Sequence, residues 1–207
     1  AGDLRVARRV LWLRADPEAV KELRLRWGLL RPQGYSFITN PFSRWDVVVA
    51  PLHGTPEEAY YREVLLRVER NRLICERDPL VAISRAIAHP RTAFSRLTLA
   101  VDSGVNVCGL AALADGIVIE ASSLPCPQVA FRVRDLKERV PHERLSIVIG
   151  DGAGADKVME GLLAQGLPVS FVDERGTTSS RTPLPIFLKD VNARAAVALA
   201  LRASVNH

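Results

Sequence analysis

The spacing of hydrophobic and polar positions divides the chain near Ser95. Before this point, short apolar runs alternate with amphipathic segments whose apolar positions recur every three or four residues. The pattern predicts strands over 6–14, 35–39 and 45–50, and helices over 17–27, 55–72 and 79–89. This order predicts a small α+β domain over residues 1–96.

Two of these helices carry start signals. Asp16 precedes Pro17, and an acidic N-cap followed by proline is a favoured way to begin a helix. Thr55 is followed three residues later by Glu58, the spacing of a capping box. Both helices are therefore expected to begin at these caps.

After Ser95 the pattern becomes that of a sheet crossed by helices. Asp115-Gly116 lies between two apolar runs, which is a strong hairpin signal. The predicted order is three strands, then helix, strand, helix, strand and helix, and strands separated by helices favour parallel pairing. The predicted strands cover 97–101, 107–114, 117–121, 145–149 and 169–172, and the predicted helices cover 128–140, 155–165 and 191–202.

Charge is distributed unevenly between these two parts. Residues 1–96 hold 17 basic and 11 acidic side chains, so their net charge is 17 − 11 = +6. Residues 97–207 hold 11 basic and 12 acidic side chains, so theirs is 11 − 12 = −1. The basic surplus predicts that the first domain helps to hold a polyanion such as nucleic acid. A solvated face on which acidic side chains pair with the arginines is the equal alternative.

Several classes of protein are disfavoured by the composition. No apolar run approaches the ~18 residues of a membrane span, so no membrane partner is expected. The first residues show no signal-peptide core, which makes the cytoplasm the expected location. The three cysteines, at 75, 108 and 126, are odd in number and far apart, so we expect buried thiols and no disulfide framework or zinc site.

Acidic residues follow three predicted strands of the second part. Asp102 closes the first strand, Asp151 follows the fourth, and Asp173 and Glu174 follow the fifth. Ligands of open α/β sheets bind beyond the carboxyl ends of the strands. Carboxylates that converge there repel one another unless a cation lies between them, and oxygen ligands suit Mg²⁺ or Mn²⁺. The arrangement predicts a metal-dependent phosphodiesterase. Strand-end acids that only cap helices and solvate loops are the alternative.

The same segments resemble a known family. The run from Leu99 through Asp102-Ser-Gly to Gly109 resembles the first strand of RNase H-like nucleases. The segment Asp173-Glu-Arg-Gly-Thr-Thr looks like the YqgF branch of that superfamily, which is similar in fold to the RuvC Holliday-junction resolvases. The segment that begins at Asp190 resembles the family's closing helix. The resemblance covers residues 97–205.

This resemblance implies an α/β, RNase H-like mixed sheet over 97–207, with a three-stranded antiparallel meander, two parallel strands and flanking helices. It implies an endonuclease that acts on branched DNA or structured RNA, including ribosomal RNA precursors, with Mg²⁺ or Mn²⁺ as cofactor, as a monomer or homodimer. Asp102, Glu174, Asp151 and Asp173 would be catalytic, and Asp102, Glu174, Asp151 and Asp190 would hold the metal. Arg175, Thr177 and Thr178 would bind substrate.

Departures from the family pattern keep other functions open. Asn192 stands where the closing helix is expected to carry an acid, and Ser103 replaces a usual proline. A catalytically impaired nucleic-acid-binding protein is therefore the main alternative. The run from Gly150 to Ala155 also fits the G-x-G-x-x-A spacing of a dinucleotide-binding turn, or of a tight strand-to-helix connection. Actin-like and sugar-kinase ATPases share the Asp-x-Gly loop but need two such cores, and this chain has length for one.

Overall fold

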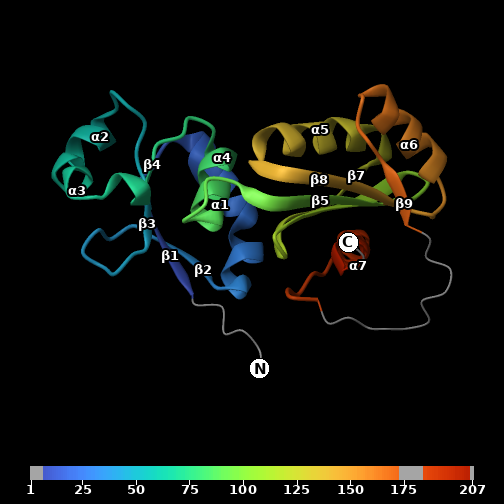
Figure 1. The fold of residues 1–207 in the computed structure, drawn as a ribbon, viewed down its shortest axis with the longest axis horizontal. Coiled ribbons are helices and arrows are strands. Elements are labelled where there is room, and N and C mark those ends of the chain that lie inside the picture. The colour runs from blue at the N-terminus through green and yellow to red at the C-terminus, as the bar shows by residue number, and fades with distance from the viewer. Residues whose placement is uncertain (1–6, 173–183, 206–207) are drawn as a thin grey trace. The chain divides into compact units, whose positions relative to one another are not determined.

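The computed structural model describes residues 7–172 and 184–205 (Figure 1). The chain forms two compact units. The first runs up to Ala93 and includes Arg139–Pro141, and the second comprises Phe94–Glu138 and the chain from His142 onward. The division between Ala93 and Phe94 falls three residues before the predicted start of the second domain.

The first unit contains a four-stranded sheet in the order β2-β1-β3-β4, and every pairing in it is parallel. The α+β prediction for this part is therefore wrong, because its strands are all parallel and helices connect β1 to β2 and β3 to β4, as in an α/β unit. The fourth strand has only two residues, too short for a periodic signal. The strands are β1 (Arg8–Trp12), β2 (Tyr35–Ile38), β3 (Val47–Val49) and β4 (Leu73–Ile74).

The helices of the first unit begin where their caps predict. The Asp16 carboxylate accepts a hydrogen bond from Ala19 N–H at 3.2 Å, and Thr55 Oγ1 accepts one from Glu58 N–H at 3.3 Å. The predicted helix over 55–72, however, is broken into short pieces. None of its side chains is fully buried, so little packing stabilises a long helix. The helices are α1 (Pro17–Leu30), η1 (Arg31–Gln33), α2 (Pro56–Tyr60), α3 (Arg62–Leu66), η2 (Arg70–Arg72) and α4 (Pro79–Ala88).

The second unit contains a five-stranded mixed sheet in the order β7-β6-β5-β8-β9. Its first three strands form an antiparallel meander, and β8 and β9 pair parallel to β5 and to β8 respectively. The predicted Asp115-Gly116 hairpin is confirmed, since both residues have positive φ, at 47° and 81°. The strands are β5 (Phe94–Asp102), β6 (Val107–Ala114), β7 (Ile117–Pro125), β8 (His142–Gly150) and β9 (Ser170–Val172).

Helices cover both faces of this sheet, with α5 and α6 on one face and α7 on the other (Figure 1). Buried apolar side chains fill β5 and β6, which lie between the two helical layers. None of the helices in the described parts of the chain is long and apolar enough to cross a membrane. The helices are η3 (Cys126–Gln128), α5 (Val129–Arg139), α6 (Ala155–Ala164) and α7 (Val191–Val205).

Candidate functional site

The strand register sets one row of residues along the carboxyl ends of β5, β8 and β9. Asp102, the last residue of β5, pairs with Gly109 of β6, which pairs with Ser123 of β7. On the other side, Val101 pairs with Ile149, so Asp102 is level with Gly150, which pairs with Val172 of β9. Asp102 is therefore the acidic member of a row that crosses the whole sheet.

The side chain of Asp102 points to the face that α7 covers. A methyl group placed on Gly109 would overlap the carbonyl oxygen of Asn192, near the start of α7. Paired residues of neighbouring strands project to the same face of a sheet, so Asp102 shares this face with Gly109. The partly buried Asp102 thus lies beside the N-terminal turn of α7.

Asp190 caps this helix. Its Oδ1 accepts hydrogen bonds from Ala193 N–H at 3.0 Å and from the Ser123 hydroxyl at 2.6 Å. These two bonds, the Ser123 bond first, lower the pKa of the Asp190 carboxyl. Asp190 therefore acts as an N-cap linked to β7, two positions across the sheet from Asp102. Asn192 lies against Gly109 of β6, the strand next to β5, whereas Asp190 is bonded to β7, one strand further from Asp102.

Two loops at this edge touch backbone to backbone. A methyl group on Gly152 would overlap the carbonyl oxygen of Ser103, and one on Gly154 would overlap that of Gly104. The Ser103 hydroxyl also donates to the carbonyl of Gly150 at 3.1 Å. The glycines after β8 are therefore needed for close packing against the loop that follows Asp102, which explains their spacing without a dinucleotide.

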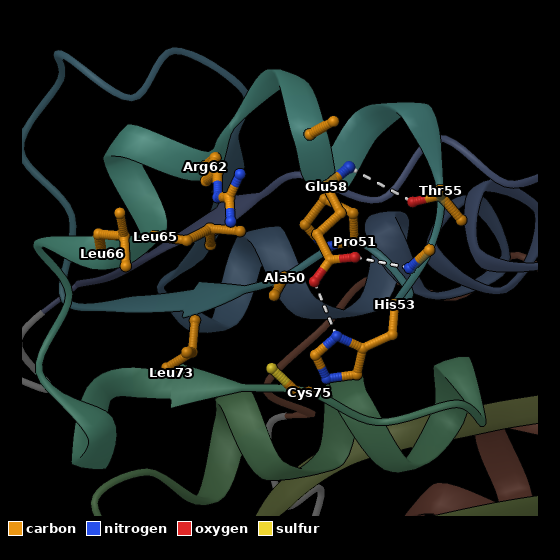
Figure 2. Close-up of a pocket in the computed structure, with 12 residues that line it drawn as sticks. Ala50, Pro51, His53, Thr55, Glu58, Arg62, Leu65, Leu66, Leu73 and Cys75 are labelled. Atoms are coloured by element: carbon orange, nitrogen blue, oxygen red, sulfur yellow. Dashed lines mark hydrogen bonds and ion pairs between the residues drawn. The ribbon is translucent and has the colours of Figure 1, made fainter.

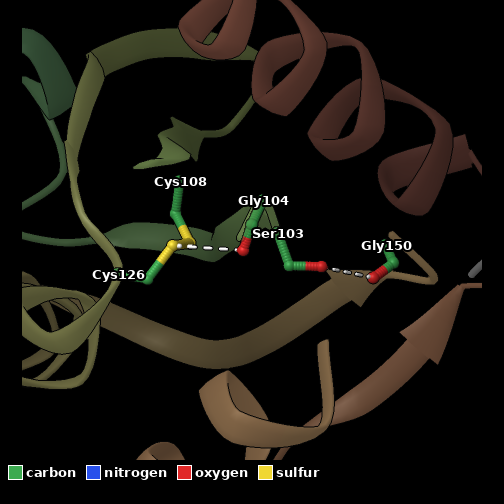
Figure 3. Close-up of a disulfide and its surroundings, with 5 residues drawn as sticks. All are labelled: Ser103, Gly104, Cys108, Cys126 and Gly150. Carbon is green, nitrogen blue, oxygen red and sulfur yellow. Dashed lines mark hydrogen bonds between the residues drawn. A yellow bond between two sulfur atoms is a disulfide. The ribbon is translucent and has the colours of Figure 1, made fainter. Parts of the chain in front are cut away.

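A disulfide joins Cys108 of β6 to Cys126, the first residue after β7 (Figure 3). The expectation of three unpaired thiols is wrong for these two, because the hairpin register brings residues 18 positions apart to the same end of the sheet. The pair braces the loop that follows Asp102. Cys126 N–H donates to the carbonyl of Asn106 at 3.0 Å, and its sulfur lies 3.4 Å from the carbonyl oxygen of Gly104.

Of the predicted site residues, Asp102 and Asp151 lie at one edge of the sheet, on the ends of adjacent strands. Asp151 is exposed in the bend after β8. No group of three His, Cys, Asp or Glu side chains suited to a metal occurs among residues 7–172 and 184–205. The remaining predicted residues lie outside the described parts of the chain: Asp173, Glu174, Arg175, Thr177 and Thr178.

The first unit holds a separate pocket of about 520 Å³ at the carboxyl ends of β3 and β4, which no pattern in the sequence predicts (Figure 2). Glu58 closes one side of it. Its carboxylate lies 2.7 Å from Nδ1 of His53 and accepts a hydrogen bond from Gly54 N–H at 2.6 Å. Cys75, the free cysteine of the chain, lines the same pocket.

Comparisons with known proteins give no family. No family model matches the chain, and no curated protein does. Several solved structures match weakly. One is a Bacteroides thetaiotaomicron VPI-5482 protein with an actin-like ATPase fold and unknown function, at 15% identity and a TM-score of 0.31 over 56% of this chain. Another is the Aquifex aeolicus PPX-GPPA enzyme, at 17% identity and 0.26 over 38%. The matches span 45% and 36% of those two proteins. Such low scores support no assignment.

Proposed function

We propose that the second unit is an RNase H-like nuclease domain, which cleaves structured nucleic acid with the help of Mg²⁺ or Mn²⁺. One observation carries the proposal. Asp102 ends the central strand of a five-stranded sheet with the order β7-β6-β5-β8-β9, and it faces the first turn of the closing helix. Ligands of sheets with parallel strands bind beyond these carboxyl ends.

The donors at this edge fit a hard cation only in part. Asp102 offers carboxylate oxygens, and Asp151 follows the neighbouring strand. Asp190 is engaged as a helix cap, so we do not count it as a primary ligand. The third oxygen ligand would come from Asp173 or Glu174, which follow Val172 in the sequence, and Val172 is paired with Gly150 in the row that contains Asp102.

A bound divalent cation would supply an activated water and would stabilise charge on the phosphate. The protein's own residues perform the other tasks. Asp102 would fix the cation at the central strand. Backbone contacts among Ser103, Gly104, Gly152 and Gly154 hold the two flanking loops in place, and the disulfide restrains the first of them. A rigid edge of this kind suits in-line attack, because positioning supplies much of the catalysis of phosphoryl transfer.

The first unit would hold the polyanion. Some of its arginines are used internally, since Arg14 pairs with Asp16 and Arg72 donates to the carbonyls of Trp45 and Asp46. Other arginines are exposed and form no ion pair within the described residues, so they remain available to phosphates. These are Arg9, Arg24, Arg31, Arg44, Arg62, Arg67, Arg70 and Arg77.

A binding protein without cleavage activity is the second candidate. Asn192 lies against Gly109, the partner of Asp102 in the sheet, and carries an amide, while Asp190 is engaged as the helix cap, so the first turn of the closing helix offers no free carboxylate. Such a protein would bind the same substrates with an affinity independent of divalent cations.

A cleavage assay separates the two functions. The full chain would be incubated with a labelled four-way DNA junction and a structured RNA in Mn²⁺. Asp102→Asn should abolish cleavage. Glu143→Gln removes the same charge from the amino end of β8, about 23 Å away along the strand, and should leave cleavage unchanged. Binding without cleavage, with equal affinity in EDTA, would favour the second candidate. If the protein neither binds nor cleaves these substrates, both candidate functions are excluded.

A further inference from the structure

The pocket of the first unit places a thiol, an imidazole and a carboxylate on consecutive strand ends. The register pairs Val49 of β3 with Ile74 of β4, and Ala50 N–H donates to the carbonyl of Ile74 at 2.9 Å. Cys75 therefore follows β4 beside the point where the chain leaves β3 toward His53. This is the carboxyl edge of a parallel sheet, where α/β proteins bind their ligands.

The local sequence explains why Glu58 meets His53. Thr55 caps α2, and Glu58 stands at the third helical position, from which a carboxylate reaches back toward the cap. Here it accepts from Gly54 N–H at 2.6 Å and lies 2.7 Å from His53 Nδ1. These two bonds, in that order, lower the pKa of Glu58, so the carboxylate is ionised at neutral pH and can only accept.

An ionised Glu58 fixes the tautomer of His53. The proton of the neutral imidazole must be on Nδ1, where the carboxylate accepts it, and Nε2 then carries the free lone pair. Cys75 and His53 line the same pocket (Figure 2). Leu65, Leu66 and Leu73 make one part of the remaining wall apolar, and Arg62 and Thr55 also line the pocket.

We propose that Cys75, His53 and Glu58 form a second reactive site, which accepts the acyl group of a small ester or thioester with an apolar chain. Cys75 is the nucleophile, His53 is the general base, and Glu58 is a positioning residue that orients His53. The three roles match the general arrangement of nucleophile, base and orienting group. The site is independent of the nuclease proposal, since all three residues lie in the first unit.

The reaction needs only the ester or thioester and water as reactants. As Sγ bonds to the carbonyl carbon, its proton passes to Nε2 of His53. The bond from that carbon to the leaving oxygen or sulfur breaks, and the leaving group takes the proton from His53. The resulting thioester on Cys75 is hydrolysed to a carboxylic acid, which restores the thiol.

The surroundings of Cys75 explain why a base is required. Burial, and then the charge of Glu58, raise the pKa of the Cys75 thiol. The sulfur is therefore protonated at neutral pH and is a weak nucleophile until a base removes the proton. Positioned general bases contribute about 10²–10⁴-fold to such rates.

The test uses the full chain with p-nitrophenyl hexanoate as the probe, followed by nitrophenol release and by mass spectrometry. Cys108 and Cys126 are joined, so Cys75 is the free thiol that can be acylated. We expect saturable acylation, one hexanoyl group on Cys75, and none on Cys75→Ala. His53→Asn should slow acylation by about 100-fold or more.

Glu58→Gln should lower the maximal rate and leave the half-saturating ester concentration unchanged, which a purely structural role for Glu58 would not do. Glu57→Gln, one position away on the same helix, is the matched control and should behave as wild type. His53 is exposed, so its replacement does not threaten folding. A His53→Asn rate within twofold of wild type, acylation of Cys75→Ala, or a wild-type rate no faster than that of N-acetylcysteine would overturn the proposal.

Discussion

Gly109→Ala tests the geometry that brings α7 to the end of the central strands. The added methyl group would overlap the backbone carbonyl of Asn192 and lie 3.3 Å from the amide nitrogen of Ala193. Backbone cannot rotate away as a side chain can, so the start of α7 must shift. Overpacking of this kind costs about 1–3 kcal/mol. Alanine also lowers the conformational entropy of the unfolded chain, which stabilises the fold by about 0.4–1 kcal/mol. We expect a net loss of about 1–2 kcal/mol in the free energy of unfolding.

Urea unfolding followed by far-UV circular dichroism is the appropriate assay, because the three tryptophans, at 12, 27 and 45, all belong to the first unit. Gly161→Ala is the matched control. That glycine lies inside α6, its nearest neighbour would be Ala130 Cβ at 3.7 Å, and the change should stabilise by about 0.5–1 kcal/mol. If Gly109→Ala is as stable as Gly161→Ala, the close approach of Gly109 and Asn192 is wrong.

Three further predictions concern the disulfide and the helix caps. Reduction, or the double change Cys108→Ser and Cys126→Ser, should cost the second unit about 3 kcal/mol by urea unfolding, as expected for a loop of this length; no change would contradict the pairing. The folded-state pKa of Asp190 is lowered, so its charge stabilises the fold above about pH 4 and loses this effect as pH falls through the folded pKa. The stability advantage of wild type over Asp190→Asn should therefore be larger at about pH 7 than at about pH 2.5, and an advantage that grows on acidification would refute this. Thr55→Ala should destabilise the first unit by about 1 kcal/mol in tryptophan-monitored unfolding, while Thr55→Ser should retain most of the stability.

The second unit follows its sequence pattern closely, for a physical reason. Its strands β5 and β6 are long and mostly buried, and the Asp115-Gly116 turn fixes the register of the hairpin. The order of its elements also appears in the structure as predicted. In the first unit the parallel strand order depends on pairings between distant segments. A two-residue strand such as Leu73–Ile74 has no periodicity of its own, so the sheet type was mistaken.

The disulfide shows where an available signal was overlooked. Ala114 pairs with Ile117 at the hairpin, and a regular ladder from this pair would place Cys108 opposite position 123. A bulge between Ala112 and Leu113 shifts the register by one, so that Cys108 pairs with Leu124. Cys126 is then only two residues away. The Asp102 edge was predicted from strand-end acids, and the register supports it for Asp102 and Asp151. The Cys75 pocket was not predicted because His53 and Cys75 are 22 positions apart and line one pocket only through the pairing of β3 with β4.

The most direct test of the metal proposal is a calorimetric titration of Mn²⁺ into the full chain, Asp102→Asn and Glu143→Gln. Both acids lie on the same sheet, at opposite ends of neighbouring parallel strands. We predict saturable binding at millimolar Mn²⁺ or below for wild type and for Glu143→Gln, and loss of saturable binding for Asp102→Asn. An isotherm for Asp102→Asn that equals that of wild type, or a wild type that binds no Mn²⁺, would contradict a metal site at the end of β5.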